Sequence, residues 1–302
     1  MSNRFSLYPS SFVHAGGTLS MVQLGAARAS MNSQFDEHIV GGAVDRGAVI
    51  LQQAAPSVDL ESADLATIFG VVSPTVGLSC TGNCIFQYQK RADQGVFAGA
   101  GTNTLATATK GFLLPTRLSA SNGGRASLGL NFHALFDGTN EPLVFSQNQN
   151  LTGTPTFTSA FYGQIVYVNG SVVDSLLSAS IDFGLAVVPQ YEDGVVFPTL
   201  MSIVARTPTI SLTFASVRHT IHTLTTAFIA ALGGAIGVYF FKGVASGKRV
   251  ANATTSHCKI SAATGSWGAD DISVQGNDDA TLTVTVRPTA ALAVSVASAI
   301  GG

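Results

Sequence analysis

The chain repeats itself at a spacing of about half its length. Six positions of the 302-residue sequence match at an offset of 152 residues, and they are the pairs Pro56/Pro208, Leu60/Leu212, Ala63/Ala215, Gly82/Gly234, Lys90/Lys242 and Gly95/Gly247. Several of these are Gly or Pro, which mark turns and breaks in a fold. The segment 126–132 also aligns with 280–286, at an offset of 154. A period this long is a whole small domain, so the sequence predicts a duplicated domain.

Each copy shows the pattern of a mainly β domain with one flanking helix. A strand, a polar loop and a second strand come before each proline of the pair Pro56/Pro208, and a helix is expected after it. The two loops are Ser30–Gly47 and Pro189–Pro198. The two helices are 62–69, with Ser62 as its N-cap, and 216–232.

Later in each copy the sequence predicts a hairpin. Its turns lie at Asn122-Gly123-Gly124 and at 276–279. The segment 95–111 is expected to be a connection rich in Gly, Thr and Ala, and 137–155 a link between the copies. The domain boundaries that follow are an arm at 1–17, a first domain at 18–137, a linker at 138–160 and a second domain at 161–302.

The surface that this composition provides is weakly charged. Charged residues are 11% of the chain, against about 25% in an ordinary soluble protein. A surface of this kind favours a subunit that is covered by copies of itself. The net charge is −2, and the largest basic clusters are the pairs Lys90-Arg91 and Lys248-Arg249. Tight nucleic-acid binding needs a basic stripe, so we do not expect it.

The cysteines and the termini favour assembly in a reducing cytoplasm. The N-terminus lacks the apolar stretch of a signal peptide. Cys80 and Cys84 could form a disulfide or bind a metal, but Cys258 is the only further thiol, so all three are expected to be free. The uncharged segment 224–241 is long enough to suggest a membrane span. Gly233-Gly234 divides it, so a buried helix followed by a buried strand is the better interpretation.

No motif in the sequence indicates catalysis, a cofactor or a metal. His219 and His222 have the spacing of metal ligands on a helix, but no obvious partner completes a site. The acidic pairs 270–271 and 278–279 lie among Gly, Ser and Asn and are typical of solvated turns. Phosphate-binding loops, nucleophile elbows and paired metal-binding cysteine motifs are absent. We therefore expect a protein that is not an enzyme.

The organisation resembles the tail tube (major tail) proteins of long-tailed, non-contractile bacteriophages. The resemblance rests on the strand–loop–strand before Pro56 and Pro208, the helix after each, and the final hairpin. It implies two tandem tail-tube-like β-sandwich domains, and homotrimeric rings of pseudo-six-fold symmetry that stack into a tube. It further implies a location in the virion tail, passage of DNA through the tube, contacts with other tail proteins at the tube ends, and no membrane insertion.

In that family an extended loop contacts the next ring, and the resemblance assigns this role to the two polar loops. The residues that we expect at these contacts are Asp36, Glu37, His38, Asp45, Arg46, Tyr191, Glu192 and Asp193. Three alternatives remain open. They are another ring-forming virion component, such as a distal tail, terminator or decoration protein, a β-rich host- or carbohydrate-binding module, and, least favoured, an enzyme. A binding module needs clustered exposed aromatics, yet Trp267 is the only tryptophan.

Overall fold

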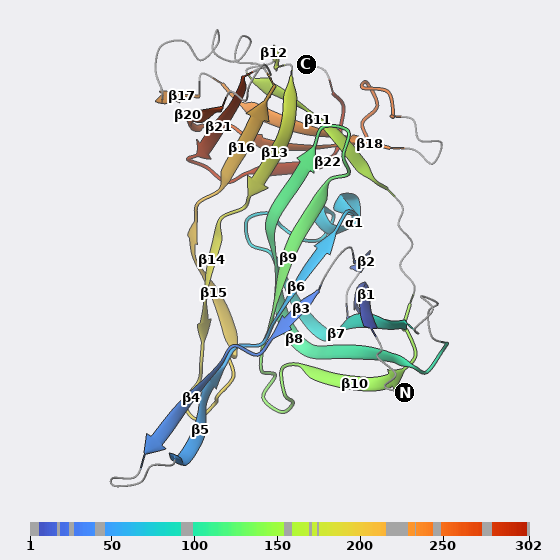
Figure 1. Cartoon of the computed structure of the whole chain (residues 1–302), viewed down its shortest axis with the longest axis vertical. Coiled ribbons are helices and arrows are strands. Elements are labelled where there is room, and N and C mark those ends of the chain that lie inside the picture. Colours follow the sequence, from blue (N-terminus) through green and yellow to red (C-terminus); the bar gives the residue numbers. More distant parts are fainter. Residues whose placement is uncertain are drawn as a thin grey trace.

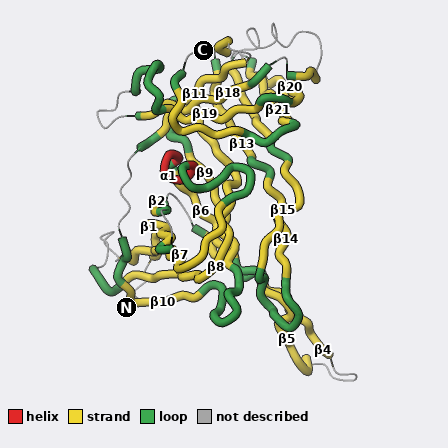
Figure 2. The backbone as a smooth tube through the Cα atoms, turned by 180° about the vertical axis from the view of Figure 1, so that it is seen from behind, coloured by secondary structure: helices red, strands yellow, loops and turns green. Residues whose placement is uncertain are grey.

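The computed structural model shows a protein built almost entirely of β-strands (Figure 1). The described residues are 6–16, 19–23, 27–39, 46–91, 99–153, 159–168, 171–173, 175–215, 229–232, 234–243, 249–273 and 280–300. Within them the single α-helix is α1 (Leu65–Phe69), drawn in red in Figure 2. The expectation of a mainly β fold is confirmed.

The first half of the chain forms the lower part of Figure 1. Its strands are β1 (Ser6–His14), β2 (Ser20–Val22), β3 (Arg28–Ser30), β4 (Ser33–Ile39), β5 (Arg46–Ala54), β6 (Ser57–Ser62), β7 (Leu78–Arg91), β8 (Asn103–Ser121), β9 (Ser127–Ala134) and β10 (Val144–Gln149). The long β8 pairs with β7 and β10 along its first part and with β9 along its second part. Strands β6 and β3 then extend the sheet beyond β9.

The second half forms the upper part. Its strands are β11 (Phe161–Val168), β12 (Ser171–Val173), β13 (Leu176–Asp182), β14 (Leu185–Gln190), β15 (Leu200–Arg206), β16 (Thr209–Phe214), β17 (Ile229–Ala231), β18 (Ile236–Lys242), β19 (His257–Ala262), β20 (Gly265–Ser273), β21 (Thr281–Pro288) and β22 (Ala293–Ser298). One sheet has the order β12-β11-β18-β19-β22. The path β17-β20-β21-β16-β13 continues through β8 into the first half.

Most strand pairings of the first half recur in the second half in the same register. In the hairpin β4–β5, Ser33 pairs with Ala54, and the register shifts after Gln34. In β14–β15 the pair is Leu185 with Arg206, and the register shifts after Ala186. Each of these positions differs by 152. The pairings β1–β7 and β11–β18, β6–β9 and β16–β21, and β8–β9 and β20–β21 match in the same way, at offsets of 152 or 154.

A glycine marks the same corner in both halves. Gly111 lies where β8 passes from pairing with β7 to pairing with β9, and a Cβ there would overlap the ring of Phe132. The matching residue, Gly265, starts β20 and has a φ of 158°, and a Cβ there would meet the carbonyl oxygen of Arg287 at 2.5 Å. Only glycine fits so close an approach, so it allows the chain to pass from one sheet to the other.

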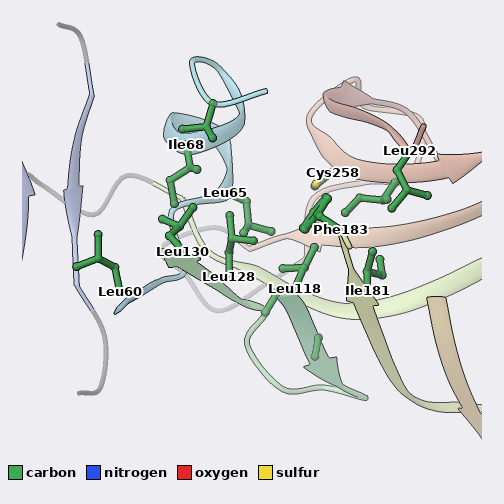
Figure 3. Packing of buried hydrophobic residues seen from close by; sticks show 14 of the residues in the cluster. Leu60, Leu65, Ile68, Leu118, Leu128, Leu130, Ile181, Phe183, Cys258 and Leu292 are labelled. Atoms are coloured by element: carbon green, nitrogen blue, oxygen red, sulfur yellow. The ribbon is translucent and has the colours of Figure 1, made fainter. Parts of the chain in front are cut away.

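One buried apolar cluster runs through both halves. In the first half the rings of Phe12, Phe86 and Phe132 pack together, with centroid separations of 5.0–6.1 Å. Helix α1 adds Leu65 and Ile68 from above the sheet (Figure 3). The cluster then continues into the second half, where the ring of Phe69 lies 5.8 Å from that of Phe183.

Several local predictions were wrong. Within the expected loop Ser30–Gly47, residues 33–39 and 46–47 are strands of the hairpin β4–β5, which projects from the body (Figure 1). Strand β8 includes 103–111, and β10 lies within the expected link between copies. The N-cap of α1 is Asp64, whose Oδ1 accepts a hydrogen bond from Thr67 N (3.4 Å), whereas Ser62 Oγ donates to Val22 O (2.7 Å).

The second expected helix, 216–232, lies mostly outside the described residues, and its end, Ile229–Ala231, is strand β17. Strand β18 accounts for the end of the apolar segment 224–241, as expected. Within the described part of the chain, no helix has the length and apolar character needed to cross a membrane.

Candidate assembly interface

Strands β8 and β13 join the two halves into one sheet. They pair antiparallel from Arg117 opposite Asp182 to Ser121 opposite Ser178. Leu118 lies opposite Ile181, and both side chains are 0% exposed. Figure 3 shows the two residues at this junction, next to Phe183 of the second half. The junction therefore has a dry apolar centre.

The two strands that match this junction lie at sheet edges. Since the pairings correspond at fixed offsets, the second-half counterpart of Leu118 is Ile272 in β20, and the first-half counterpart of Ile181 is Ala29 in β3. In the described residues β3 pairs only with β6, and β20 pairs only with β17 and β21. Ile272 is 50% exposed, and Ala29 is also exposed. The two strands that correspond to β8 and β13 thus each have one side without a strand partner at these positions in the described residues.

The two strands with a free side carry residues of opposite charge, Arg28 on β3 and Asp271 on β20. Within the chain, Arg117 Nε donates a hydrogen bond to Ser180 Oγ (2.6 Å), two positions away from its opposite residue Asp182. The residues that match Arg117 and Ser180 are Asp271 and Arg28. If β3 of one copy paired with β20 of another in the same register, these opposite charges would be diagonal neighbours, a favourable arrangement.

The hairpin β14–β15 makes a second contact between the halves. It runs down the side of the first half, as the tube in Figure 2 also shows, and its loop reaches the base of β5. Ala54 N donates to Val196 O (2.9 Å) and Phe136 N donates to Pro198 O (2.8 Å). Lys110 Nζ donates to Thr199 O (2.9 Å). These three hydrogen bonds fix the loop against the first half.

A pocket between the second half and Pro74 and Thr75 of the first half lies at the position that corresponds to the place where the first half receives this loop. Arg206 and Ala290, which match Ala54 and Phe136, both line it. The pocket is lined by Pro74, Thr75, Phe183, Leu185, Arg206, Pro208, Pro288, Thr289, Ala290, Ala291 and Leu292. The hairpin that matches β14–β15 is β4–β5, and it points away from this pocket in its own chain (Figure 1). The pocket therefore occupies the position that corresponds to the docking site of the β14–β15 loop on the first half.

Both hairpins expose large apolar side chains. On β4–β5 these are Phe35, Val49 and Ile50, and on β14–β15 they are Val188, Leu200 and Val204. A two-stranded ribbon cannot cover both of its faces within one chain. Exposed apolar patches of this kind are typical of protein–protein contacts.

The residues predicted for ring contacts are divided between these hairpins. Asp36, Glu37 and His38 lie on β4, Arg46 begins β5, and Asp45 lies outside the described residues. Tyr191, Glu192 and Asp193 lie in the loop of β14–β15, where partial burial raises the pKa of Tyr191. The bond from Ala54 to Val196 brings this loop to the base of the hairpin that carries the first group.

Sequence reasoning missed the junction itself. The signal was present, because the offset that relates the copies also relates Leu118 to Ile272, but only the pairing of β8 with β13 shows which strands join. The other candidates add nothing to this site. His219, His222 and the pair 278–279 lie outside the described residues, and only the backbone of 270–271 is described.

No protein-family model matches the chain, and a search of curated proteins finds no matching sequence.

Proposed function

We propose that the protein is a structural subunit whose copies join head to tail into a closed ring, and that these rings stack into the tail tube of a long-tailed bacteriophage. The observation that carries the proposal is the exposed pair of edges, β3 and β20, that matches the buried junction β13–β8. A junction between two different edges is heterologous, so each copy uses one edge and leaves the other for its neighbour.

Under this proposal, head-to-tail joining gives a closed ring where the rotation between successive halves closes on itself, and an open filament otherwise. If the second junction has the geometry of the internal one, each half is rotated relative to the preceding half by a similar angle. Three copies then supply six similar units, the number that the resemblance to tail tube proteins implies. A closed ring also pairs the two edges β3 and β20, which a single chain leaves unpaired in the described residues. In this reading each half is a tail-tube-like β-sandwich domain.

The charge of the chain supports a conduit better than a DNA-binding surface. The net charge is −2, and no basic cluster exceeds two adjacent residues. Tight DNA binding depends on several neutralised phosphates, and a tube that releases DNA must avoid it. The hairpin β4–β5 docks its exposed apolar side chains on a neighbouring copy, either in the same ring or in the next ring of the stack.

Two alternative functions are distinguished by the size of the assemblies that the purified chain forms. Another ring-forming virion component would use the same edges but stop at one ring or a short stack. A carbohydrate-binding module would present exposed aromatics and remain discrete. The only tryptophan, Trp267, is buried, which disfavours the module.

Negative-stain electron microscopy of the purified chain over a range of concentrations tests the proposal. We expect hollow tubes or rings whose axial views show three-fold symmetry and six similar lobes. The variant Ile272→Asp should remain folded and monomeric, because it places a charge at the centre of the proposed junction. Val144→Asp, an exposed valine on β10, is the matched control. Discrete monomers of the wild type at every concentration would overturn the proposal.

A further inference from the structure

Three side chains with metal-ligating atoms converge where β1 ends beside β7. His14 is the last residue of β1, and Cys80 and Cys84 belong to β7. One ligand atom from each lies within 4.8 Å of the others, and all three residues are buried. His14 and Cys84 are also directly paired in the sheet. The cluster therefore joins two strands that are far apart in the sequence.

The backbone around the cluster is firmly held and lies next to solvent. The register of β7 against β8 shifts between Thr81 and Cys84, where Gly82 has a φ of 90°. Ala15 N donates to Asn83 O (2.7 Å), which fixes the end of β1 to this bulge. Residues 81–83 are exposed, so a cation can reach the buried cluster from this side.

The hydrogen bonding of His14 leaves one ring nitrogen available as a ligand. Its Nε2 lies 3.0 Å from the carbonyl oxygen of Thr81. A carbonyl can only accept, so Nε2 carries the proton and the lone pair of the neutral ring is on Nδ1. Metal-binding histidines are commonly oriented in this way, with the second ring nitrogen donating to a backbone carbonyl.

The second half shows that the fold does not require these residue types. The pair His14–Cys84 corresponds to the pair Val168–Ile236 of the second half. The pair Cys80–Gly111 corresponds to Leu232 and Gly265, which are joined by a backbone hydrogen bond. The strands have the same register in both halves, yet the second half has three aliphatic residues where the first half has His and two Cys. The cluster is thus specific to the first half and is not a consequence of strand pairing.

We propose that His14, Cys80 and Cys84 form a binding site for a thiophilic cation of the zinc type, which clamps β1 to β7. Thiolate and imidazole are the ligands that zinc prefers, and three protein ligands leave one position for water or a backbone carbonyl. With Zn–S of about 2.3 Å and Zn–N of about 2.0 Å, tetrahedral ligand atoms are roughly 3.5–3.8 Å apart. The observed limit of 4.8 Å requires only small side-chain rotations. Binding replaces the thiol protons, which are released to solvent.

Titration of the reduced, chelator-treated full-length chain with Co²⁺ tests the site. We expect a thiolate-to-cobalt charge-transfer band that saturates at one Co²⁺ per chain and disappears when Zn²⁺ is added. Cys84→Ala and His14→Val should weaken cobalt binding at least tenfold, whereas Cys258→Ala, at the third buried cysteine, should leave it unchanged. Zn²⁺ should raise the unfolding temperature of the wild type and not that of Cys84→Ala.

Folding of the variants is checked separately, by their circular dichroism without metal. Should the single variants unfold, the triple variant H14V/C80L/C84I copies the residues of the second half and serves in their place. The proposal is overturned if the wild type shows no band at micromolar Co²⁺, or if a folded variant lacking Cys84 retains the band.

Discussion

Leu118 lies opposite Ile181 where β8 pairs with β13, and neither side chain is accessible to solvent. Their counterparts at the unjoined edges, Ile272 and Ala29, are exposed. Equivalent positions of one repeat therefore have opposite environments within a single chain. Burial of a large apolar side chain such as that of Ile272 contributes about 1.5–3 kcal/mol. Under the proposed assembly, this free energy would favour the association of two copies.

The two environments predict different effects of the same substitution. Leu118→Ala should lower the free energy of unfolding by about 2–5 kcal/mol, because it leaves a cavity in the core. Ile272→Ala should change the stability of the monomer by less than about 0.5 kcal/mol. Urea denaturation of both variants, at a concentration below assembly, measures the difference. Equal losses would show that Ile272 is already covered within the monomer.

The corner of β8 predicts a strong requirement for glycine at one position. Gly111→Ala places a methyl group against the ring of Phe132, which packs with Phe12 and Phe86 and cannot easily move. Overpacking of this kind costs about 1–3 kcal/mol of stability. Gly99→Ala is the control, since a Cβ at Gly99 meets nothing within 4 Å. Thermal unfolding should show a lower midpoint for the first variant alone.

Asp137 predicts a pH dependence in the segment that follows β9. Its carboxylate accepts hydrogen bonds from Asn140, from Thr109 Oγ1 (2.7 Å) and from Thr139 N (2.8 Å), and these lower its pKa. A lowered folded-state pKa means that the contribution to stability is present above the unfolded value of about 3.9 and is lost as the pH falls below it.

Asp137→Asn isolates this effect. The wild type should be more stable than the variant at pH 7, and the difference should shrink as the pH falls below about 4. Urea unfolding of both proteins between pH 7 and pH 3 measures it. A difference that stays constant over this range would mean that ionisation of Asp137 does not contribute.

The repeat was predictable from sequence because several of the residues that match between the copies are Gly or Pro, which mark turns and breaks in secondary structure. Gly82 lies at the register shift of β7 with a φ of 90°, which favours glycine, and Pro56 and Pro208 immediately precede β6 and β16. The strands that were missed lack this signal. The first part of β8 is rich in Thr and Ala, and its burial comes from β7 and β10 on either side.

The candidate sites depended on contacts that a linear sequence does not contain. The segment of β4–β5 contains charged residues such as Asp36 and Glu37, so the sequence predicted a loop there. It forms a hairpin because strands of a projecting ribbon can pair without a regular alternation of apolar residues. His14 was not associated with Cys80 and Cys84, because only the pairing of β1 with β7 brings them together.

Charge reversal across the proposed junction provides the most specific test of how copies join. If the copies join in the register of the internal junction, Arg28 of one copy would be a diagonal neighbour of Asp271 of the next. Arg28→Asp or Asp271→Arg alone places like charges together and should prevent rings, while R28D/D271R restores opposite charges at every junction and should restore them. Sedimentation velocity, with electron microscopy of the pelleted material, compares the three variants. Assembly of both single variants, or failure of a folded double variant to assemble, would show that the copies join by other surfaces.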